Sequence, residues 1–406
     1  MPDGEHGTQN DDGVGFGVTE VKGTVCSSRV EDGLELRTGQ TGNSGRGITE
    51  VGAGPPAAAV DDDNGGFEQR LSCSESGKEV KDKVRQTWLL GEIAEVSLWL
   101  VFFSIWGVLA RLGISALETY PGKTVDGLVW TQFIGCVVMG FLAESKSMFN
   151  LTSGQTLQVY IGMTTGFCGS MTTFSSWMQS TFLAMANAGH EFDRPRGFSV
   201  LALFNGIIVT LCMSLAGLKF GGHVGVFVRY LWPKVSNGRV CRPSGKWTVP
   251  VLQSFAVVFG LGCWVGAILM SIFVKKWRGK VLFGLVFGPV GTISRWLLSR
   301  YLNTRVPGFL MGTFAANILG TMLIGVFSIA QQRTNGVTGC NVLQGLMDGY
   351  CGCLTTVSTF ALELQSLKRH HAWRYGGTSI SVGVIMMCLT MGVNNWRFEE
   401  FRLRQC

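Results

Sequence analysis

The chain has 406 residues, of which 46% are hydrophobic and 15% are charged, and its formal net charge is +7 at pH 7. The hydrophobic residues gather in long continuous stretches, which excludes an ordinary soluble protein of two or three domains. The 12 cysteines are scattered without paired metal-ligand spacings, so we interpret them as small core residues rather than as a zinc site or a disulfide framework.

The N-terminal segment differs in character from the rest of the chain. Residues 1–75 contain 14 aspartates and glutamates against 5 lysines and arginines, with many glycines and few aromatic residues. Such a segment buries too little apolar surface to offset the entropy lost on ordering, so we predict a disordered acidic tail over residues 1–85. Its start has no apolar signal-peptide core, and we expect the first membrane span to direct insertion.

Apolar stretches long enough to cross a bilayer follow this tail. A spanning helix needs about 20 mostly apolar residues, and nine segments meet this requirement. We therefore predict an all-α polytopic membrane protein with nine transmembrane helices. The predicted spans are residues 96–116, 124–143, 157–182, 198–219, 251–274, 281–302, 309–330, 342–364 and 378–393.

The first four and the last four spans repeat one another. Gly-Phe-Cys-Gly-Ser-Met-Thr-Thr-Phe-Ser at 166–175 is close to Gly-Tyr-Cys-Gly-Cys-Leu-Thr-Thr-Val-Ser at 349–358, and Gln132 aligns with Asn317 in the span before. The predicted organisation is a first four-helix repeat over residues 90–220, a basic loop over 221–250, a bridging helix over 251–274, a second four-helix repeat over 281–395 and a C-terminal tail over 396–406.

The bridging helix decides how the repeats are oriented. Four spans return the chain to its starting side, and one additional crossing makes the second repeat begin on the opposite side. We therefore expect two inverted repeats, related by a pseudo-two-fold axis in the membrane plane. Lysines and arginines are slightly more numerous on the side of the N-terminus, which favours a cytoplasmic N-terminus.

The predicted spans hold few ionisable residues. All five histidines lie outside them, no lysine lies deep in a span, and acidic residues within them are few, with Asp348 and Glu363 both in the eighth span. A membrane hydrolase or a proton-coupled carrier usually needs several ionisable groups at membrane depth. The sequence therefore argues against an enzyme.

Each repeated motif places glycines and hydroxyls at membrane depth, where polar groups are costly unless they face a partner, an ion or water. We expect Gly166, Gly169, Gly349 and Gly352 to unwind the helix and free backbone groups, with close helix packing as the alternative. The hydroxyls form a polar stripe, which ordinary interhelical hydrogen bonding would also explain for any single one of them. They belong to Thr172, Thr173, Ser175, Ser176, Thr355, Thr356, Ser358 and Thr359.

Aromatic residues accompany the hydroxyl stripe. Phe174 and Trp177 share its face in the first half, as do Val357 and Phe360 in the second half. The positive edge of an aromatic ring favours a small anion at little desolvation cost, while core packing is the alternative role.

Amide and guanidinium groups complete the candidate site. Asn317 has two N–H donors in an otherwise apolar span, and Gln132 supplies a longer amide at the matching place. Arg111 and Arg295 fall near the predicted span ends, where their side chains could extend to lipid headgroups or form an anion vestibule, and we favour the structural role.

Three motifs in this order resemble those of the Fluc fluoride channels. They are Gly-Pro-Val-Gly-Thr-Ile-Ser-Arg at 288–295, Gly-Thr-Phe-Ala-Ala-Asn-Ile-Leu-Gly at 312–320 and Gly-Tyr-Cys-Gly-Cys-Leu-Thr-Thr-Val-Ser-Thr-Phe-Ala-Leu-Glu at 349–363. Two repeats joined by a bridging span are similar to the fused eukaryotic form, the FEX fluoride exporters. The resemblance covers about residues 90–395 and leaves the tail unexplained.

The resemblance implies a passive fluoride-selective channel made of two antiparallel four-helix units. It implies that Asn317 is a pore amide, that Phe174 and Phe360 are pore phenylalanines, that Glu363 is the family's glutamate and that the hydroxyls form the polar track. It further implies a central sodium ion, although the sequence leaves open whether this chain binds it. The carbonyls that would hold this ion belong to Gly169, Thr172, Gly352 and Thr355.

Four positions depart from the family pattern. Gln132 replaces an asparagine, Trp177 and Val357 replace phenylalanines, and Ser180 stands where the first repeat would carry a glutamate. The bacterial homodimers have two identical pores, but here the substitutions fall unevenly on the two halves. We therefore expect one competent pore that involves Asn317 and one degenerate pore, with Gln132 and Trp177 kept as candidate pore residues.

The expected activity is export of fluoride down the membrane potential, which supplies about 2.3 kcal/mol per 100 mV for one charge. The expected partners are fluoride and the lipid bilayer, with no nucleic acid and no organic cofactor. A plasma membrane suits this export, and the fused repeats suit a functional monomer. The alternatives are an ion-coupled secondary transporter of a small anion, which also favours inverted repeats, and a scaffold without transport.

Overall fold

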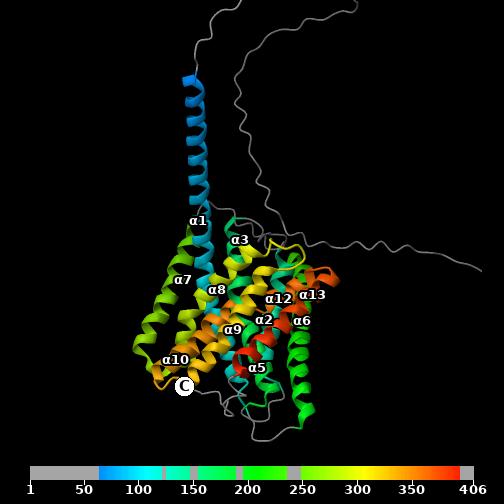
Figure 1. Cartoon of the computed structure of the whole chain (residues 1–406). Helices are drawn as coiled ribbons and strands as arrows, with labels where there is room; N and C mark the ends of the chain where they lie inside the picture. Colours follow the sequence, from blue (N-terminus) through cyan, green and yellow to red (C-terminus); the bar gives the residue numbers. More distant parts are fainter. Residues whose placement is uncertain (1–63, 121–124, 147–153, 189–194, 236–247, 394–406) are drawn as a thin grey trace, which may run out of the picture. The chain divides into compact units, whose positions relative to one another are not determined.

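The chain forms helices throughout the part that the computed structural model describes (Figure 1). This confirms the predicted all-α class. The chain divides into two compact units at residue 85, and the described part of the first unit consists of the beginning of helix α1. The described residues are 64–120, 125–146, 154–188, 195–235 and 248–393.

Helix α1, Asn64–Leu117, begins earlier than the composition predicts. It starts inside the segment 1–85, so the prediction of a disordered tail is wrong for residues 64–85. This stretch is rich in Lys, Glu, Gln and Arg, which are good helix formers, and an existing helix extends without a new nucleation step. Residues 1–63 and the predicted C-terminal tail 396–406 lie outside the described part of the chain.

Six described helices are long and apolar enough to span a bilayer. The third and eighth predicted spans are missing from this set because each is interrupted. The bridging helix α7, Thr248–Phe273, contributes the apolar stretch Val257–Phe273 among the residues described. The fold is therefore a polytopic helical one, and the inverted layout of nine spans stays a prediction. The six helices are Gly91–Leu117, Gly127–Ser145, Gly197–Trp232, Lys275–Leu302, Met311–Arg333 and Arg369–Gly392.

In the first repeat, α1 is followed by the uninterrupted helices α2, Gly127–Ser145, and α6, Arg196–Val235. Helix α6 enters the segment 221–250, so the prediction of a basic loop is wrong for residues 221–235, because an apolar run through Trp232 continues the helix. The interrupted span between α2 and α6 consists of α3, Gly154–Ile161, the π-helix η1, Gly162–Cys168, α4, Gly169–Met171, and α5, Phe174–Met185.

The second repeat follows the same order. It opens with two short helical turns and the long helix α8, and its interrupted span again separates two long helices. Its elements are η2, Lys275–Trp277, η3, Arg278–Leu282, α8, Phe283–Leu302, α9, Met311–Arg333, α10, Val337–Gly345, the π-helix η4, Leu346–Cys351, α11, Gly352–Leu354, α12, Ser358–Ser366, α13, Arg369–Met387, and η5, Cys388–Gly392.

The short half-helix of each repeat packs against long helices of the other repeat as well as against its own. Helix α5 of the first repeat packs against α9 and α13 of the second, and α12 of the second packs against α2 and α6 of the first. Because α2 corresponds to α9 and α6 to α13, the two sets of contacts are the same set with the repeats exchanged. Such reciprocity is the signature of a two-fold interface.

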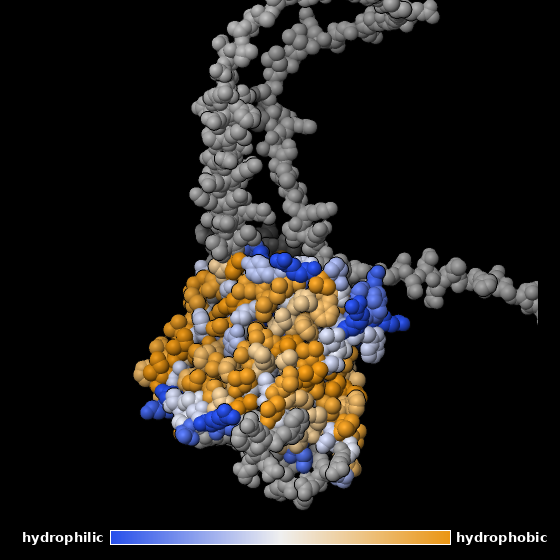
Figure 2. Space-filling view, in the orientation of Figure 1, coloured by the Kyte–Doolittle hydropathy of each residue, from blue (hydrophilic) through white to orange (hydrophobic). Residues whose placement is uncertain are grey.

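Apolar side chains cover the middle of the molecular face in Figure 2, and hydrophilic residues gather toward its two ends. Large hydrophobic residues are exposed along α6 and α7, among them Phe204, Phe227 and Val258, which is 65% exposed. A large apolar surface of this kind is unfavourable in contact with water, so it requires a lipid environment.

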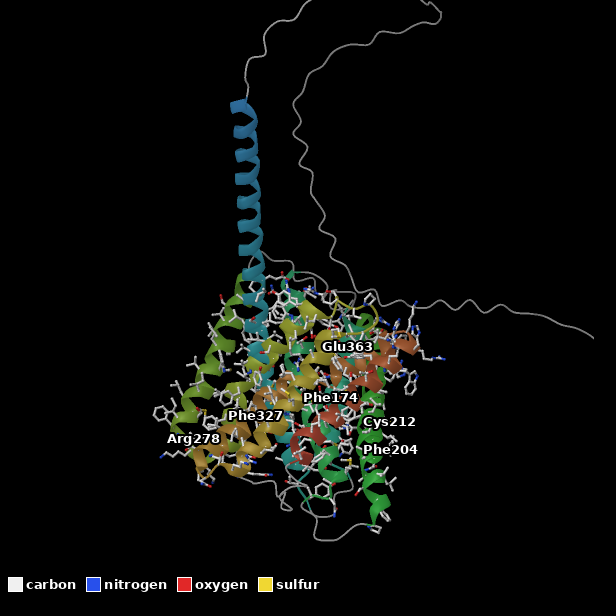
Figure 3. All side chains as sticks on the ribbon, in the orientation of Figure 1. Phe174, Phe204, Cys212, Arg278, Phe327 and Glu363 are labelled. Atoms are coloured by element: carbon white, nitrogen blue, oxygen red, sulfur yellow. The ribbon has the colours of Figure 1, made fainter. Side chains whose placement is uncertain are left out.

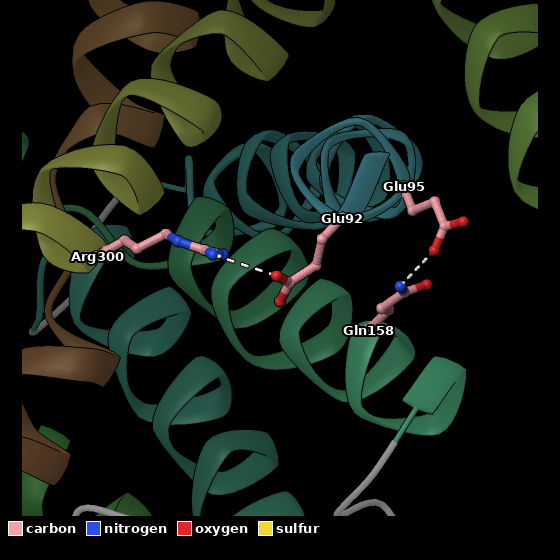
Figure 4. Close-up of polar contacts among 4 residues, drawn as sticks. All are labelled: Glu92, Glu95, Gln158 and Arg300. Atoms are coloured by element: carbon pink, nitrogen blue, oxygen red, sulfur yellow. Dashed lines mark hydrogen bonds and ion pairs between the residues drawn. The ribbon is translucent and has the colours of Figure 1, made fainter. Parts of the chain in front are cut away.

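Polar contacts tie α1 to two neighbouring helices (Figure 4). Arg300 Nη2 lies 3.3 Å from Glu92 Oε2, and Gln158 Nε2 donates to Glu95 Oε2 at 2.6 Å. These contacts join α1 to α8 of the second repeat and to α3 of the first.

Candidate functional site

The candidate site is built where the two interrupted spans meet. In the first repeat, Thr172 and Thr173 leave the helical conformation, with φ/ψ of −102°/142° and −141°/124°. In the second repeat, Thr355 does the same with φ/ψ of −95°/157°. All three residues are fully buried, and the short helices α4 and α11 that precede them are in contact.

The Thr172 hydroxyl of the first repeat caps the half-helix α12 of the second repeat. Its Oγ1 accepts hydrogen bonds from the backbone N–H groups of Val357, at 3.3 Å, and Ser358, at 3.0 Å. The same hydroxyl donates to the Cys168 carbonyl of its own repeat at 3.0 Å. It thereby satisfies N–H groups at the start of α12 that have no partner inside the helix.

The Thr355 hydroxyl of the second repeat makes the equivalent contacts with the half-helix α5 of the first. Its Oγ1 accepts from the N–H groups of Phe174 and Ser175, both at 3.1 Å, and it donates to the Cys351 carbonyl at 3.0 Å. Each repeat therefore supplies a hydroxyl acceptor for N–H groups at the start of the other repeat's half-helix. The half-helix α5 has a further cap from its own repeat, because Thr173 Oγ1 accepts from the Ser176 N–H at 3.4 Å.

A carboxamide braces each break from within its own repeat. Asn317 Nδ2 donates to the Thr356 carbonyl at 3.3 Å, and its Oδ1 accepts from the Thr356 N–H at 2.9 Å. Gln132 Nε2 donates to the Thr173 carbonyl at 2.7 Å, and its Oε1 accepts from the Thr173 N–H at 3.2 Å. The two predicted amides are thus equivalent in geometry, and both are fully buried.

The remaining hydroxyls extend two small networks around the breaks. Thr173 Oγ1 lies 3.2 Å from Ser175 Oγ and donates to Ser176 Oγ at 3.3 Å. Thr356 Oγ1 lies 3.4 Å from Ser358 Oγ and accepts from the Thr359 N–H at 3.4 Å. Ser176 and Thr359 are the partly exposed members of the predicted stripe.

The predicted aromatic residues lie in one buried cluster that draws on both repeats. The rings of Phe174 and Phe360 meet edge to face, with centroids 5.7 Å apart, and Trp177 packs edge to face on Phe174 at 5.4 Å. Val357 belongs to the same cluster. The Trp177 N–H is committed to the Gly206 carbonyl at 2.8 Å, so this indole offers a ring and not a free donor.

Glu363, which is labelled in Figure 3, contacts Tyr375 of this cluster and is held by two hydroxyls. Thr313 donates to its Oε1 at 2.6 Å, and Tyr375 donates to its Oε2 at 2.7 Å, while the Tyr375 ring packs on Phe360 with centroids 5.3 Å apart. Sequence reasoning missed Thr313 and Tyr375. The signal for Thr313 was its place four residues before Asn317, one helical turn away on the same face; Tyr375 had no comparable signal.

The corresponding place in the first repeat is open. Ser180, which stands where that repeat would carry a glutamate, lines a pocket of about 380 Å³ together with Asp126, Thr181 and Asn205. The pocket lies among α2, α5 and α6, beside the N-terminus of α2. The two ends of the site therefore differ, with a hydrogen-bonded carboxylate at one and a polar pocket at the other.

The glycines of the repeated motif stay helical, so the expectation that they unwind the helix is wrong. Gly169 has φ/ψ of −69°/−27°, and Gly166 and Gly349 lie within π-helical segments. A side chain at Gly169 or Gly352 would collide with an arginine guanidinium, and one at Gly349 would collide with the Gly284 backbone. Their role is close approach, which was the alternative interpretation, and the threonines that follow them interrupt the helix.

The guanidinium of Arg295 lies at the centre of the site and not near a membrane surface. Its side chain is 2% exposed, and Nη1 donates to the carbonyls of Gly169 at 2.8 Å, Cys353 at 2.5 Å and Thr355 at 3.0 Å. Its Nη2 donates to the Thr165 carbonyl. This residue therefore bonds backbone from both repeats.

Arg111, the equivalent residue of the first repeat, is also buried, with 4% of its side chain exposed. Its Nη2 donates to the Asp348 carbonyl, and its Nη1 has no hydrogen-bond partner. Asp348 aligns with Thr165, so the Nη2 groups of the two arginines bond equivalent carbonyls. Only Arg295 also bonds carbonyls through Nη1. The prediction that these side chains extend to lipid headgroups is wrong, because both are buried and bond backbone carbonyls within the protein.

Comparison with known proteins assigns this architecture to a family. The family described as CrcB-like protein, Camphor Resistance (CrcB), matches residues 98–218 and 282–393. The chain is 37% identical over 351 residues to Fluoride export protein 1 of Neurospora crassa, covering 73% of this chain and 66%, just under two thirds, of that relative. No solved structure matches the chain.

Two further relatives differ in how much of this chain they match. Fluoride export protein 1 of Schizosaccharomyces pombe is 31% identical over 302 residues, covering 72% of this chain and 94% of the relative. The Fluoride-specific ion channel FluC of Acinetobacter baumannii is 32% identical over 120 residues, which is 94% of that protein but 28% of this chain. The resemblance predicted from the three motifs is confirmed, and because the family match covers more than half of its residues, the chain belongs to the CrcB family.

Proposed function

We propose that this chain is a passive fluoride-selective channel, and not an enzyme, that lets fluoride leave the cytoplasm. The relatives named fluoride export protein and fluoride-specific ion channel support this function. The observation that carries it is the buried meeting point of the two helix breaks, where hydroxyls, amide N–H groups and aromatic edges come together. Fluoride is small and strongly hydrated, and several weak neutral donors can replace its water without trapping it.

The conducting path that we propose runs between α9, α5 and α12. Helix α9 contributes Thr313, Asn317 and Thr321, which are fully buried and lie on one helix face at a spacing of four residues. Helix α5 faces them with Phe174, whose ring meets Phe360 edge to face. One N–H of Asn317 is bonded to Thr356, and the second N–H of the amide is the donor that we propose for the anion.

The matching path along α2 is the one that we propose to be closed. The residues equivalent to Thr313, Asn317 and Thr321 are Leu128, Gln132 and Cys136, so two hydroxyls are replaced by apolar or weakly polar groups. Cys136 packs with Leu218 and Ala361 in an apolar cluster. This packing supports one competent and one degenerate pore.

We further propose that the two repeats are inverted in the membrane and that one chain suffices for function. The reciprocal caps of Thr172 and Thr355 support the two-fold relation, and the single bridging helix supports the inversion. A plasma membrane with an inside-negative potential would drive export of a monovalent anion without ATP.

The decisive experiment is a matched pair of amide-to-acid substitutions. Asn317→Asp and Gln132→Glu each remove the amide donors from an equivalent clamp, so both should lower stability by similar amounts. Only Asn317→Asp should lower transport strongly, because it removes a donor from the proposed anion path and places a negative charge there. We expect a loss of roughly tenfold or more, since one lost buried donor costs about 1–3 kcal/mol. The measurement is fluoride-electrode efflux from proteoliposomes.

The same assay separates the rival functions. A channel gives fast efflux that requires valinomycin to relieve the opposing potential and that shows little chloride flux under the same conditions. A coupled transporter of a small anion would give slow, saturable flux that depends on a second ion. Vesicles that leak no more fluoride than empty ones would favour a scaffold, and equal transport loss in both variants would contradict the single-pore proposal.

A further inference from the structure

The family resemblance assigns a sodium ion to the centre of the interface between the two repeats. The carbonyls expected to hold it are those of Gly169, Thr172, Gly352 and Thr355. In this structure, two of them, Gly169 from the first repeat and Thr355 from the second, accept hydrogen bonds from the same nitrogen, Arg295 Nη1. The residues present therefore do not fit a sodium ion at this point.

The guanidinium is well suited to the site that it occupies. It is planar and presents five N–H donors in a fixed fork, so it can bond carbonyls on several sides at once. Arg295 bonds four of them, two in the first repeat, Thr165 and Gly169, and two in the second, Cys353 and Thr355. One side chain of α8 thus joins both helix breaks, as a shared metal ion would.

The backbone around the site is shaped for a guanidinium. The space that a side chain would fill at Gly169 is taken by atoms of the Arg295 guanidinium, and the space at Gly352 is taken by the Arg111 guanidinium. Both glycines are helical, so neither is required by an unusual backbone conformation. The lack of a Cβ at each position instead allows an arginine to lie against the helix.

Electrostatics also disfavours an additional cation. The Arg295 side chain is almost completely buried, and the Arg111 guanidinium lies against Gly352, the residue next to Cys353, whose carbonyl Arg295 bonds. A sodium ion at the same carbonyls would be a third positive charge in a poorly screened interior. It would also have to displace hydrogen bonds that the buried guanidinium needs.

We propose that the guanidinium of Arg295 is the resident central cation of this protein, in place of a bound sodium ion, so that the fold is held together independently of sodium. Arg111 is the incomplete counterpart, with one carbonyl bond and a buried Nη1 that has no partner. This inference concerns the central scaffold and does not depend on which anion the protein carries.

The test measures stability and does not rely on transport. The full chain is purified in detergent, and its thermal unfolding is followed by tryptophan fluorescence in sodium chloride and in N-methyl-D-glucamine chloride at equal ionic strength. We expect the two unfolding temperatures to agree within about 1 °C, whereas an ion bound at 100 times its dissociation constant would raise the unfolding temperature by roughly 5 °C or more. A sodium-dependent rise of that size in the unaltered protein would overturn the proposal.

A matched pair of variants tests the two arginines separately. Arg295→Gln should unfold at a clearly lower temperature than the unaltered protein in both salts, because it leaves four buried carbonyls without their donor. Arg111→Gln removes one such bond and should lower the unfolding temperature less, again without a sodium response. An equal effect of the two substitutions would contradict the assignment of Arg295 as the central cation.

A third variant covers the case in which Arg295→Gln does not fold. Arg295→Lys keeps the charge but offers three donors from a point rather than a planar fork, so it should fold and should unfold at a lower temperature than the unaltered protein in both salts. A lysine variant as stable as the unaltered protein would show that the fork geometry is not required. Fluoride efflux of the unaltered protein into sodium-free buffer is recorded alongside, and its absence there with unchanged stability would count against the proposed function and not against this inference.

Discussion

Thr172 and Thr355 show how much a single hydroxyl can do at membrane depth. Each one donates to a carbonyl of its own repeat and accepts from two N–H groups of the other repeat. In lipid, no water can replace these partners, so the hydroxyl supplies the acceptor that the start of the half-helix needs. Each of these threonines is one member of a polar stripe in the sequence, but in the structure its hydroxyl connects the two repeats by hydrogen bonds.

The hydrogen bonds of the Thr172 hydroxyl lead to a prediction at the residue scale. Thr172→Val keeps the shape of the side chain but leaves the N–H groups of Val357 and Ser358 without that acceptor, so we expect a loss of about 2 kcal/mol or more in the free energy of unfolding. The control is Thr172→Ser, which retains the hydroxyl. Thermal or denaturant unfolding in detergent measures both, and a valine variant as stable as the serine variant would refute the cap.

At the scale of elements, glycines set the distance between α2 and α6. A Cβ at Gly140 would collide with the Leu218 carbonyl, and one at Gly221 would collide with the Val137 carbonyl. The two helices thus lie backbone to backbone, as small residues allow in membrane proteins. This close packing supports the half-helices α5 and α12, each of which contacts α6.

Adjacent glycines on α6 provide a matched test of this packing. Gly221→Ala should lower the free energy of unfolding by about 1–3 kcal/mol, because the added methyl group has no space. At Gly222, nothing lies within 4 Å of an added Cβ, so Gly222→Ala should be neutral or stabilise by up to about 1 kcal/mol through helix propensity. Unfolding measurements on the two variants check this, and similar values for both would mean that α2 and α6 are not in backbone contact.

At the scale of the whole molecule, the two halves are built on one plan but are not identical. Asn317 and Gln132 make equivalent hydrogen bonds to the backbone of Thr356 and Thr173. Glu363 in the second repeat, by contrast, has no equivalent carboxylate in the first, where Ser180 stands and lines a pocket. Arg295 has four carbonyl partners and Arg111 has one. A fused pair can specialise in this way because a substitution in one half is not copied into the other.

The proposed inversion of the repeats gives the prediction at this scale. A short peptide tag inserted after Tyr120, beyond α1, and another after Arg305, beyond α8, follow equivalent helices of the two repeats. Inverted repeats place the two tags on opposite sides of the membrane. Antibody access in sealed and permeabilised cells reads out each tag, with transport of the tagged proteins as the control for folding, and two tags on the same side would rule out the inversion.

The sequence by itself determined the helical class, the repeated order of elements and the segments that carry the polar site. These follow from local patterns, since apolar stretches of spanning length and paired Thr-Thr motifs can be recognised without knowing what they touch. The same reliance on local patterns led to the two wrong boundaries. Composition placed a tail over residues 64–85 and a loop over 221–235, where helices continue from neighbouring spans.

Only the tertiary structure decided which partner each polar group takes. The caps of Thr172 and Thr355 join residues 180 or more positions apart, and the bond from Arg295 to Gly169 spans 126 positions. Nothing in the local sequence distinguishes a glycine that unwinds a helix from one that makes room for a guanidinium, because the difference lies in the neighbour and not in the glycine. The same holds for Arg295. Its position near a predicted span end does not indicate that its guanidinium bonds carbonyls beside both helix breaks.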